Sequence, residues 1–276
     1  MAKPFVKWVG GKTQLLPMLS NLAPNEYGTY FEPFIGGGAL YFKLEPKNAI
    51  LNDLNSHLTN LYIHIRDDVD ELIAELTSLQ TDYIKLDHEG RKEFYYVQRD
   101  AFNNLGDNTI EKSTLLVFLN RTCFNGIYRV NPSGKFNVPF GRNNHTSIFD
   151  PNILNDASKD LQNTKILQGT YEDSLKGAKK GDFIYFDPPY VPLTPTSKNF
   201  TGYTGKDFGL NEHTELRDTF KQLSDNGCYV MLSNSDTEKV RELYKEFTIT
   251  EVLASRSVNC KAHGRGKITE LIITNY

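Results

Sequence analysis

The sequence lacks the features that mark membrane, secreted and disulfide-stapled proteins. No apolar run in its 276 residues approaches the roughly 20 residues that span a bilayer, and the first residues show no apolar segment typical of a signal peptide. Its three cysteines, Cys123, Cys228 and Cys260, lie far apart and form no Cys-x-x-Cys pair, which argues against a disulfide framework or a zinc site. We therefore expect a cytoplasmic protein with reduced thiols, no bound metal and no membrane anchor.

Acidic residues are absent from two stretches of the chain, although its net charge is −3. Residues 112–149 contain five Lys or Arg and residues 252–269 contain four, both without Asp or Glu. Concentrated positive charge favours binding to the phosphates of nucleic acid. Two solvated faces that happen to lack acids remain the alternative.

Strand-like apolar runs alternate with helical patterns, at residues 29–34, 49–52, 182–186 and 229–232. Apolar residues recur at helical spacing from Val69 to Leu79 and from Leu216 to Leu223. We expect Asn211 to cap the second helix and Gly227 to end it. The alternation predicts an α/β fold with a mostly parallel sheet, helices on both sides, and a ligand crevice beyond the carboxyl ends of the strands.

The segment from residue 56 to residue 159 has a different character, with mostly helical patterns rich in Tyr, Phe and Asn. One β-hairpin is predicted inside it, because runs at residues 127–130 and 135–138 flank the turn sequence Asn-Pro-Ser-Gly. We interpret residues 56–159 as an insertion that interrupts a sheet domain formed by residues 1–55 and 160–276.

A glycine-rich loop follows the first strand-like run, in the sequence YFEPFIGGGAL. Glycines there let the backbone approach a ligand and aim helix N-terminal amides at it, although any tight turn can be glycine-rich. Asp53 ends the next strand-like run, where its carboxylate can accept hydrogen bonds from ribose hydroxyls. Together these features favour a cofactor that contains a nucleoside.

A rival interpretation starts from Gly11-Lys12-Thr13, because these residue types end a phosphate-binding P-loop. That motif needs a glycine where this chain has Val6, and a preceding strand for which the N-terminus leaves little room. Trp8, the single tryptophan, is either a packing aromatic or a wall of the cofactor pocket.

The segment Asp187-Pro188-Pro189-Tyr190 ends the third strand-like run. Each proline removes an N–H and stiffens the residue before it, so the carboxylate of Asp187 and the carbonyl of Pro188 form a cluster of acceptors beside the flat ring of Tyr190. Such a site suits the N6 amine of adenine, because accepting both of its protons frees the nitrogen lone pair for attack. A rigid strand-to-loop turn is the structural alternative.

With these motifs in this order, the sequence resembles the Dam-type, amino-group DNA adenine methyltransferases. The likeness rests on Asp-Pro-Pro-Tyr, on a Phe-x-Gly-x-Gly loop formed by Phe34, Gly36 and Gly38, and on Lys-Trp-x-Gly-Gly-Lys at residues 7–12, and it covers nearly the whole chain. It implies a Rossmann-like methyltransferase sheet with an inserted target-recognition domain that carries the β-hairpin. It also implies S-adenosylmethionine as methyl donor, bound by the glycine loop and by Trp8, Lys12, Asp53 and Asp187. The segment from Asp187 to Tyr190 would hold the target base.

The resemblance also assigns DNA-reading roles to residues 120–142, which are similar to the family's target-recognition hairpin. In relatives the arginine that matches Arg129 reads a guanine, and the aromatic residue that matches Phe124 wedges into the base stack. Further residues implied at the bases are Lys7, which matches a lysine at a second guanine, and Asn125, Ile127 and Pro139. The implied partner is double-stranded DNA with the site 5′-GATC-3′. The second basic stretch is expected to form a loop that holds phosphates.

An adenine inside a duplex cannot reach Asp187, so the hypothesis requires base flipping and direct methyl transfer without a covalent enzyme intermediate. We expect a monomer or a weak dimer. A methyltransferase acting on RNA or on a protein amide, and a DNA-binding module without catalysis, remain rivals. Roles in restriction-modification, in replication-linked marking and in a phage all stay open.

Overall fold

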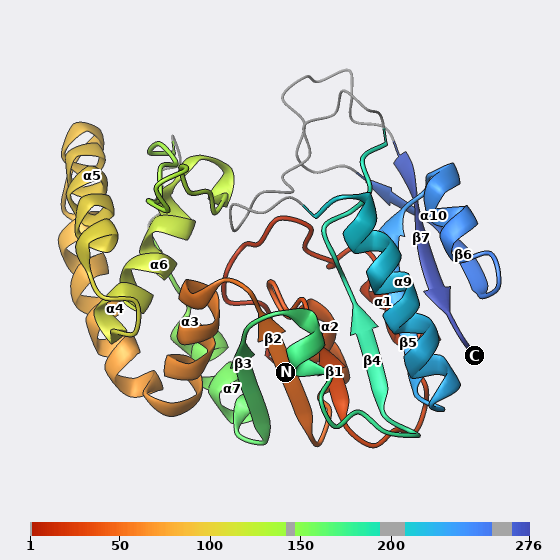
Figure 1. The fold of residues 1–276 in the computed structure, drawn as a ribbon. Helices are drawn as coiled ribbons and strands as arrows, with labels where there is room; N and C mark the ends of the chain where they lie inside the picture. The colour runs from red at the N-terminus through yellow and green to blue at the C-terminus, as the bar shows by residue number, and fades with distance from the viewer. Residues whose placement is uncertain (1, 142–146, 194–207, 256–266) are drawn as a thin grey trace.

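The computed structural model describes residues 2–141, 147–193, 208–255 and 267–276, and these residues build a seven-stranded sheet flanked by helices (Figure 1). The strands are β1 (Tyr30–Glu32), β2 (Ala49–Asp53), β3 (Thr164–Gln168), β4 (Phe183–Phe186), β5 (Tyr229–Ser235), β6 (Thr248–Ser255) and β7 (Lys267–Thr274). Their order is β3-β2-β1-β4-β5-β7-β6. β7 runs antiparallel to β5 and β6, whereas the other neighbours pair in parallel. The mixed α/β architecture is therefore confirmed.

The four predicted strands correspond to β1, β2, β4 and β5, and β2 and β5 extend past the predicted ends to Asp53 and Ser235. The sequence did not predict β3. It is an edge strand with one fully buried residue, Thr164, so its apolar pattern is weak. β6 and β7, which were not assigned from the sequence, lie on either side of the second basic stretch.

Ten helices surround the sheet within the part of the chain that the structure describes. They are α1 (Leu16–Leu22), α2 (Ala39–Leu44), α3 (Ser56–Asp67), α4 (Val69–Ile84), α5 (His88–Asn104), α6 (Ile110–Thr122), α7 (Pro151–Leu161), α8 (Tyr171–Ser174), α9 (Leu210–Asp225) and α10 (Glu238–Leu243). In Figure 1, α4, α5 and α6 lie beyond the β3 edge, whereas α9 and α10 lie near β4, β5 and β7. None of the described helices combines the length and the apolar character needed to cross a membrane.

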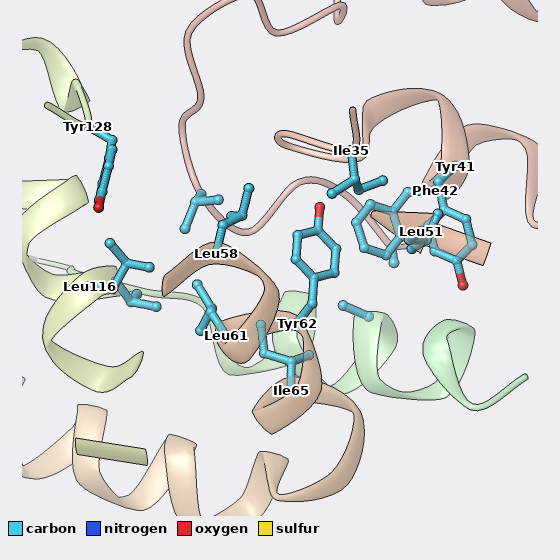
Figure 2. Packing of buried hydrophobic residues seen from close by; sticks show 14 of the residues in the cluster. Ile35, Tyr41, Phe42, Leu51, Leu58, Leu61, Tyr62, Ile65, Leu116 and Tyr128 are labelled. Carbon is cyan, nitrogen blue, oxygen red and sulfur yellow. The ribbon is translucent and has the colours of Figure 1, made fainter. Parts of the chain in front are cut away.

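Two buried clusters cover the two faces of the sheet, because successive side chains of a strand point to opposite faces. On β4, Phe183 and Tyr185 pack with α1 to α7, whereas Ile184 and Phe186 pack with α8, α9 and α10. The first cluster also joins the sheet to the helices of residues 56–159. Figure 2 shows Leu51 of β2, Tyr62 of α3 and Leu116 of α6 as members of this one cluster. The division into two domains stays a prediction.

The predicted helices are confirmed as α4 and α9, but the predicted cap of α9 is wrong. Asn211 lies inside the helix, and Gly209 is the N-cap residue. The side chain of Glu212 accepts a hydrogen bond from the Gly209 amide at 2.8 Å, which satisfies this end of the helix. Gly227 follows the last turn with a φ of 79°, as a glycine that ends a helix does.

The predicted β-hairpin forms only in part. Residues 127–130 and 135–138 are joined by an isolated antiparallel bridge between Val130 and Phe136, not by two regular strands. The predicted turn is present, because the amide of Gly134 donates to the carbonyl of Asn131 at 2.9 Å. Buried aromatic residues also hold the segment. Phe136 packs against Tyr128 and Phe102.

Candidate active site at the carboxyl edge of the sheet

One face of the sheet changes from apolar to polar at the carboxyl ends of β1, β4 and β5. Strand alternation places a polar side chain on this face at the end of each strand. β7 runs in the opposite direction, so its beginning reaches the same edge, and the register pairs Ser235 with Glu270. The side chains gathered here are Glu32, Asp187, Ser233, Ser235 and Glu270.

Asp187 forms an ion pair with Lys12, whose Nζ lies 2.7 Å from Oδ1. The Lys12 side chain is only 8% exposed, and its ammonium also donates to the carbonyl of Gly10 at 2.6 Å. The same Nζ lies 4.7 Å from the ring centroid of Tyr190. The structure therefore brings an N-terminal lysine together with the carboxylate and the ring of Asp-Pro-Pro-Tyr.

The environment of Asp187 shifts its ionisation. Burial raises the pKa of Asp187 to about 6, the Lys12 ammonium acts to lower it, and the negative charge of Glu270 raises it further. The ion pair also weakens the P-loop interpretation, because it engages the lysine that would contact a phosphate. The described residues that precede Lys12 form no strand.

The glycine loop between β1 and α2 is compact, and a side chain at Gly36 or Gly38 would meet its neighbours. Gly36 and Gly38 have φ values of 48° and 66°, in the region that favours glycine. A Cβ on Gly36 would lie 3.0 Å from Cδ1 of Trp8, and one on Gly38 would lie 2.6 Å from the hydroxyl of Tyr62. That hydroxyl donates to the Gly36 carbonyl at 3.1 Å, and Figure 2 shows it pointing toward the loop at Ile35.

Trp8 and Asp53 flank this loop. Trp8 stacks on Tyr128 with ring centroids 5.2 Å apart and an interplanar angle of 26°. The carboxylate of Asp53 accepts hydrogen bonds from the amides of Gly36 and Asn55 at 3.2 and 3.0 Å. Burial raises the pKa of Asp53, and these amides act to lower it. Each carboxylate oxygen has a second lone pair, so Asp53 can accept a further hydroxyl.

Phe34, also predicted at the cofactor, packs in an aromatic cluster. Its ring stacks on Tyr171 at 5.5 Å and meets the edges of Phe186 and Phe208. These residues belong to the cluster of the α9 face. The structure thus separates the ring of Phe34 from the group formed by Trp8 and Gly36.

The sequence did not single out Glu32, a buried carboxyl group at the end of β1. The hydroxyl of Tyr30 donates to its Oε2 at 2.7 Å, and the amide of Tyr41 also donates to it. Burial raises the pKa of Glu32 to about 8, against the lowering effect of the Tyr30 hydrogen bond. Tyr41 lies in the first turn of α2, whose N-cap is Gly38 and therefore has no side chain. Glu32 thus supplies the hydrogen-bond acceptor that a capping side chain would give. An acidic residue inside an apolar strand-like run is the sequence feature that could have identified it.

The predicted DNA-binding residues gather around the segment that follows α6, which Figure 1 shows on the side of the molecule toward which β4 points. Phe124 is 48% exposed, and its amide donates to the carbonyl of Pro139 at 2.9 Å. Asn125 is exposed with a φ of 58°. Ile127 is half-buried. The exposed Arg129 donates from Nε to Oδ1 of Asn137 at 2.8 Å, which holds the guanidinium against the turn.

Lys7 reaches the same region from the N-terminal segment. The side chain of Asn120 accepts from the Lys7 amide at 2.9 Å and donates to the Lys7 carbonyl at 2.8 Å. A Cβ on Gly126 would lie 2.7 Å from Cδ of Lys7. An open groove of about 700 Å³ adjoins Lys7 and Asn125. The second basic stretch, with Lys261 and Arg265, lies outside the described residues.

Other contributors to the site gave no signal in the sequence. Tyr62 and Tyr128 come from the helical region, and each contacts the loop or the tryptophan only because the chain folds back. Asn234 lies near the end of β5 and Glu270 lies within β7, and neither residue was assigned to a strand from the sequence. The contact of Glu270 with Tyr190 depends on the antiparallel register of β7, whereas Asn234 of β5 contacts Val191, the residue after Tyr190.

The assembled groups can perform specific chemistry. Oδ2 of Asp187 and the carbonyl of Pro188 are hydrogen-bond acceptors, and a partly buried aromatic ring adjoins them. The glycine loop, Trp8 and Asp53 offer close backbone approach, an aromatic wall and a hydroxyl acceptor, which are the features that suit a nucleoside. Among the described residues no cluster of His, Cys, Asp and Glu is arranged to hold a metal ion.

Comparisons with known proteins agree with this chemistry. A family model described as D12 class N6 adenine-specific DNA methyltransferase matches residues 8–258. The chain is 44% identical to the type II methyltransferase M1.LlaDCHI of Lactococcus lactis subsp. cremoris, over 99% of this chain and 95% of the relative. It is 44% identical to the type II methyltransferase M.MjaIII of Methanocaldococcus jannaschii, over 99% of both chains. It is also 33% identical to a DNA adenine methylase of Haemophilus influenzae, over 98% of this chain and 92% of that protein.

Proposed function

Because the chain belongs to the D12 class of N6 adenine-specific DNA methyltransferases, we propose that it transfers a methyl group from S-adenosylmethionine to an adenine flipped out of 5′-GATC-3′ in duplex DNA. The adenine-specific DNA methyltransferase activity is that of the family. The donor, the extrusion of the base and the recognition sequence are the parts that we infer from individual residues.

The observation that carries the proposal is the cluster of Asp187, Tyr190 and Lys12. In the proposed complex, Oδ2 of Asp187 and the carbonyl of Pro188 accept the two N6 protons while the adenine stacks on Tyr190. Lys12 holds Oδ1 at 2.7 Å, so the carboxylate keeps its orientation and its second oxygen stays available. These acceptors favour a pyramidal nitrogen. Their interaction with the amine is therefore stronger in the transition state than in the planar ground state.

The residues around the glycine loop fit S-adenosylmethionine, which supplies an electrophilic methyl group on a sulfonium when bound. The positive φ values of Gly36 and Gly38 form the tight turn whose backbone would face the donor. Asp53 would accept a ribose hydroxyl, and Trp8, held by its stack on Tyr128, would form a wall of the pocket. Phe34 would contribute by fixing the loop through its aromatic packing and not through its own contact.

The duplex requirement follows from the position of the acceptor at the edge of the sheet. A base within a stack cannot reach a partly buried carboxylate, so the adenine has to leave the helix at a cost of a few kcal/mol. Phe124 is an exposed aromatic side chain on the segment after α6, and it could fill the gap. Arg129 and Lys7 would read the two guanines. A bidentate arginine–guanine contact is worth roughly 1–3 kcal/mol of discrimination.

Labelled methyl transfer to short duplexes that differ only in the central tetranucleotide tests the proposal. We expect incorporation into the GATC duplex and none when the adenines of both strands are replaced by N6-methyladenine. An RNA duplex of the same sequence serves as the rival acceptor. Transfer to RNA at an equal rate, or equal transfer to every tetranucleotide that contains adenine, would overturn the proposed substrate.

A further inference from the structure

Glu270 lies within β7, at the first position that pairs with β5, and contacts the hydroxyl of Tyr190. The hydroxyl of Tyr190 donates to its Oε2 at 2.9 Å. Glu270 is half-buried and is the register partner of Ser235, so it lies on the face and at the edge where Asp187 lies.

The backbone after Tyr190 is fixed independently. Oδ1 of Asn234 accepts hydrogen bonds from the amides of Val191 and Ser235, at 3.1 and 2.9 Å. The hydroxyl of Ser235 donates to the Val191 carbonyl at 2.5 Å. The prolines stiffen the chain on the other side. The main freedom left to Tyr190 is therefore rotation of its side chain.

We propose, on the premise of the function above, that Glu270 is a positioning residue for methyl transfer. By accepting the hydrogen bond of the Tyr190 hydroxyl, it fixes the ring on which the flipped adenine stacks. Glu270 itself touches neither the base nor the methyl donor.

The hydrogen bond is well suited to this task. Burial raises the pKa of Tyr190 well above its ordinary value, and the charges of Asp187 and Glu270 raise it further, so the hydroxyl stays protonated and donates. A hydrogen bond to an ionised acceptor is roughly twice as strong as one between neutral groups. A ring that is ordered before the base arrives loses less freedom on the way to the transition state.

Two other roles for Glu270 predict different results. Its negative charge raises the pKa of Asp187, so it could act as a charge on the carboxylate. It could also be a brace between β5 and β7 with no effect on the reaction. Glu270→Gln keeps an acceptor for the hydroxyl and removes the charge. Glu270→Ala removes both, and Tyr190→Phe removes the donor.

The experiment measures single-turnover methyl transfer to the GATC duplex by the full-length protein, its three single variants and the double variant Tyr190→Phe/Glu270→Ala. We expect Glu270→Ala to slow transfer about tenfold, which corresponds to one hydrogen bond of about 1.4 kcal/mol. Glu270→Gln should lie between the wild type and Glu270→Ala, because a hydrogen bond to a neutral acceptor is roughly half as strong as one to an ionised acceptor. The double variant should be no slower than the slower single variant, because both changes remove the same contact.

Glu246→Ala is the matched control. Glu246 is an exposed carboxylate that pairs with Lys221 at 3.1 Å and precedes β6, at the opposite end of the sheet, and its loss should leave the rate unchanged. Glu270→Gln as slow as Glu270→Ala would overturn the proposal in favour of a charge effect. Multiplied losses in the double variant, or a normal rate in Glu270→Ala, would also overturn it. A wild-type protein that methylates no DNA adenine would instead overturn the proposed function.

Discussion

Replacing Asp187 by alanine separates catalysis from binding most directly. The change removes the acceptor that we propose for the N6 amine and leaves the glycine loop and the segment after α6 in place. Removing one preorganised electrostatic contact from an active site typically lowers kcat by about 10²–10³-fold. We expect a loss of this size in single-turnover methyl transfer, with duplex binding retained in an anisotropy titration.

The structure also sets the expected cost in stability. Removing one partner of a buried ion pair costs about 3–5 kcal/mol when the remaining charge has no other contact. Lys12 keeps the carbonyl of Gly10 and the ring of Tyr190, and Asp187 is itself destabilised by burial, as its raised pKa shows. We therefore expect the free energy of unfolding in urea to fall by only about 1–2 kcal/mol.

Asp236→Ala is the matched control for this variant. Asp236 follows β5 and pairs with Nε of Arg241 at 2.7 Å, with a partly buried side chain like that of Asp187. Its loss should reduce stability by about 1 kcal/mol or less and leave the transfer rate intact. Near-normal turnover in Asp187→Ala would refute the assignment. So would equal activity losses in the two variants, because instability would then explain both.

Three further predictions concern recognition, pH and the glycine loop. Arg129→Ala should relax discrimination at one base pair by about tenfold to a hundredfold in a panel of substituted duplexes, while its affinity for unrelated DNA changes little. Protonated Asp187 cannot accept from both the Lys12 ammonium and the N6 amine, so kcat/KM for DNA should fall as the pH drops through about 6. Lys12→Met should move this acidic limb of the pH profile to higher pH, because the ammonium lowers the pKa of Asp187. A limb that stays in place would contradict this cause. Gly38→Ala should reduce the free energy of unfolding by about 2–3 kcal/mol in thermal denaturation, because the position combines a φ of 66° with a hydroxyl 2.6 Å from the new Cβ. Gly134→Ala is the control: its φ is 76° but the space around it is open, so the cost should be about 1 kcal/mol.

The sequence predicted the centre of the fold better than its edges. Residues 183–186 form a continuous apolar run because β4 is buried on both faces, and such runs are easy to recognise. β3 and β6 lie at the edges and show weaker patterns. The cap of α9 was misplaced because a glycine N-cap has no side chain to reveal it, and its acceptor, Glu212, lies inside the helix.

In the candidate site, too, some residues could be predicted from the sequence and others could not. Asp187, Lys12, Trp8 and Gly36 belong to short motifs, and the structure places them within a few ångströms of one another or of a shared neighbour. Their supporting residues come from distant parts of the chain. Glu270 reaches Tyr190 only because β7 inserts between β5 and β6 in the opposite direction, and no local pattern encodes that order.

The ammonium of Lys12 above the ring of Tyr190 has a geometric consequence. An aromatic ring has two sides, and a cation 4.7 Å from its centroid takes one of them. If the adenine stacks on this ring as proposed, it can do so from the remaining side alone. The protein then fixes which edge of the purine meets Asp187, and an adenine in the flipped-over orientation cannot bind.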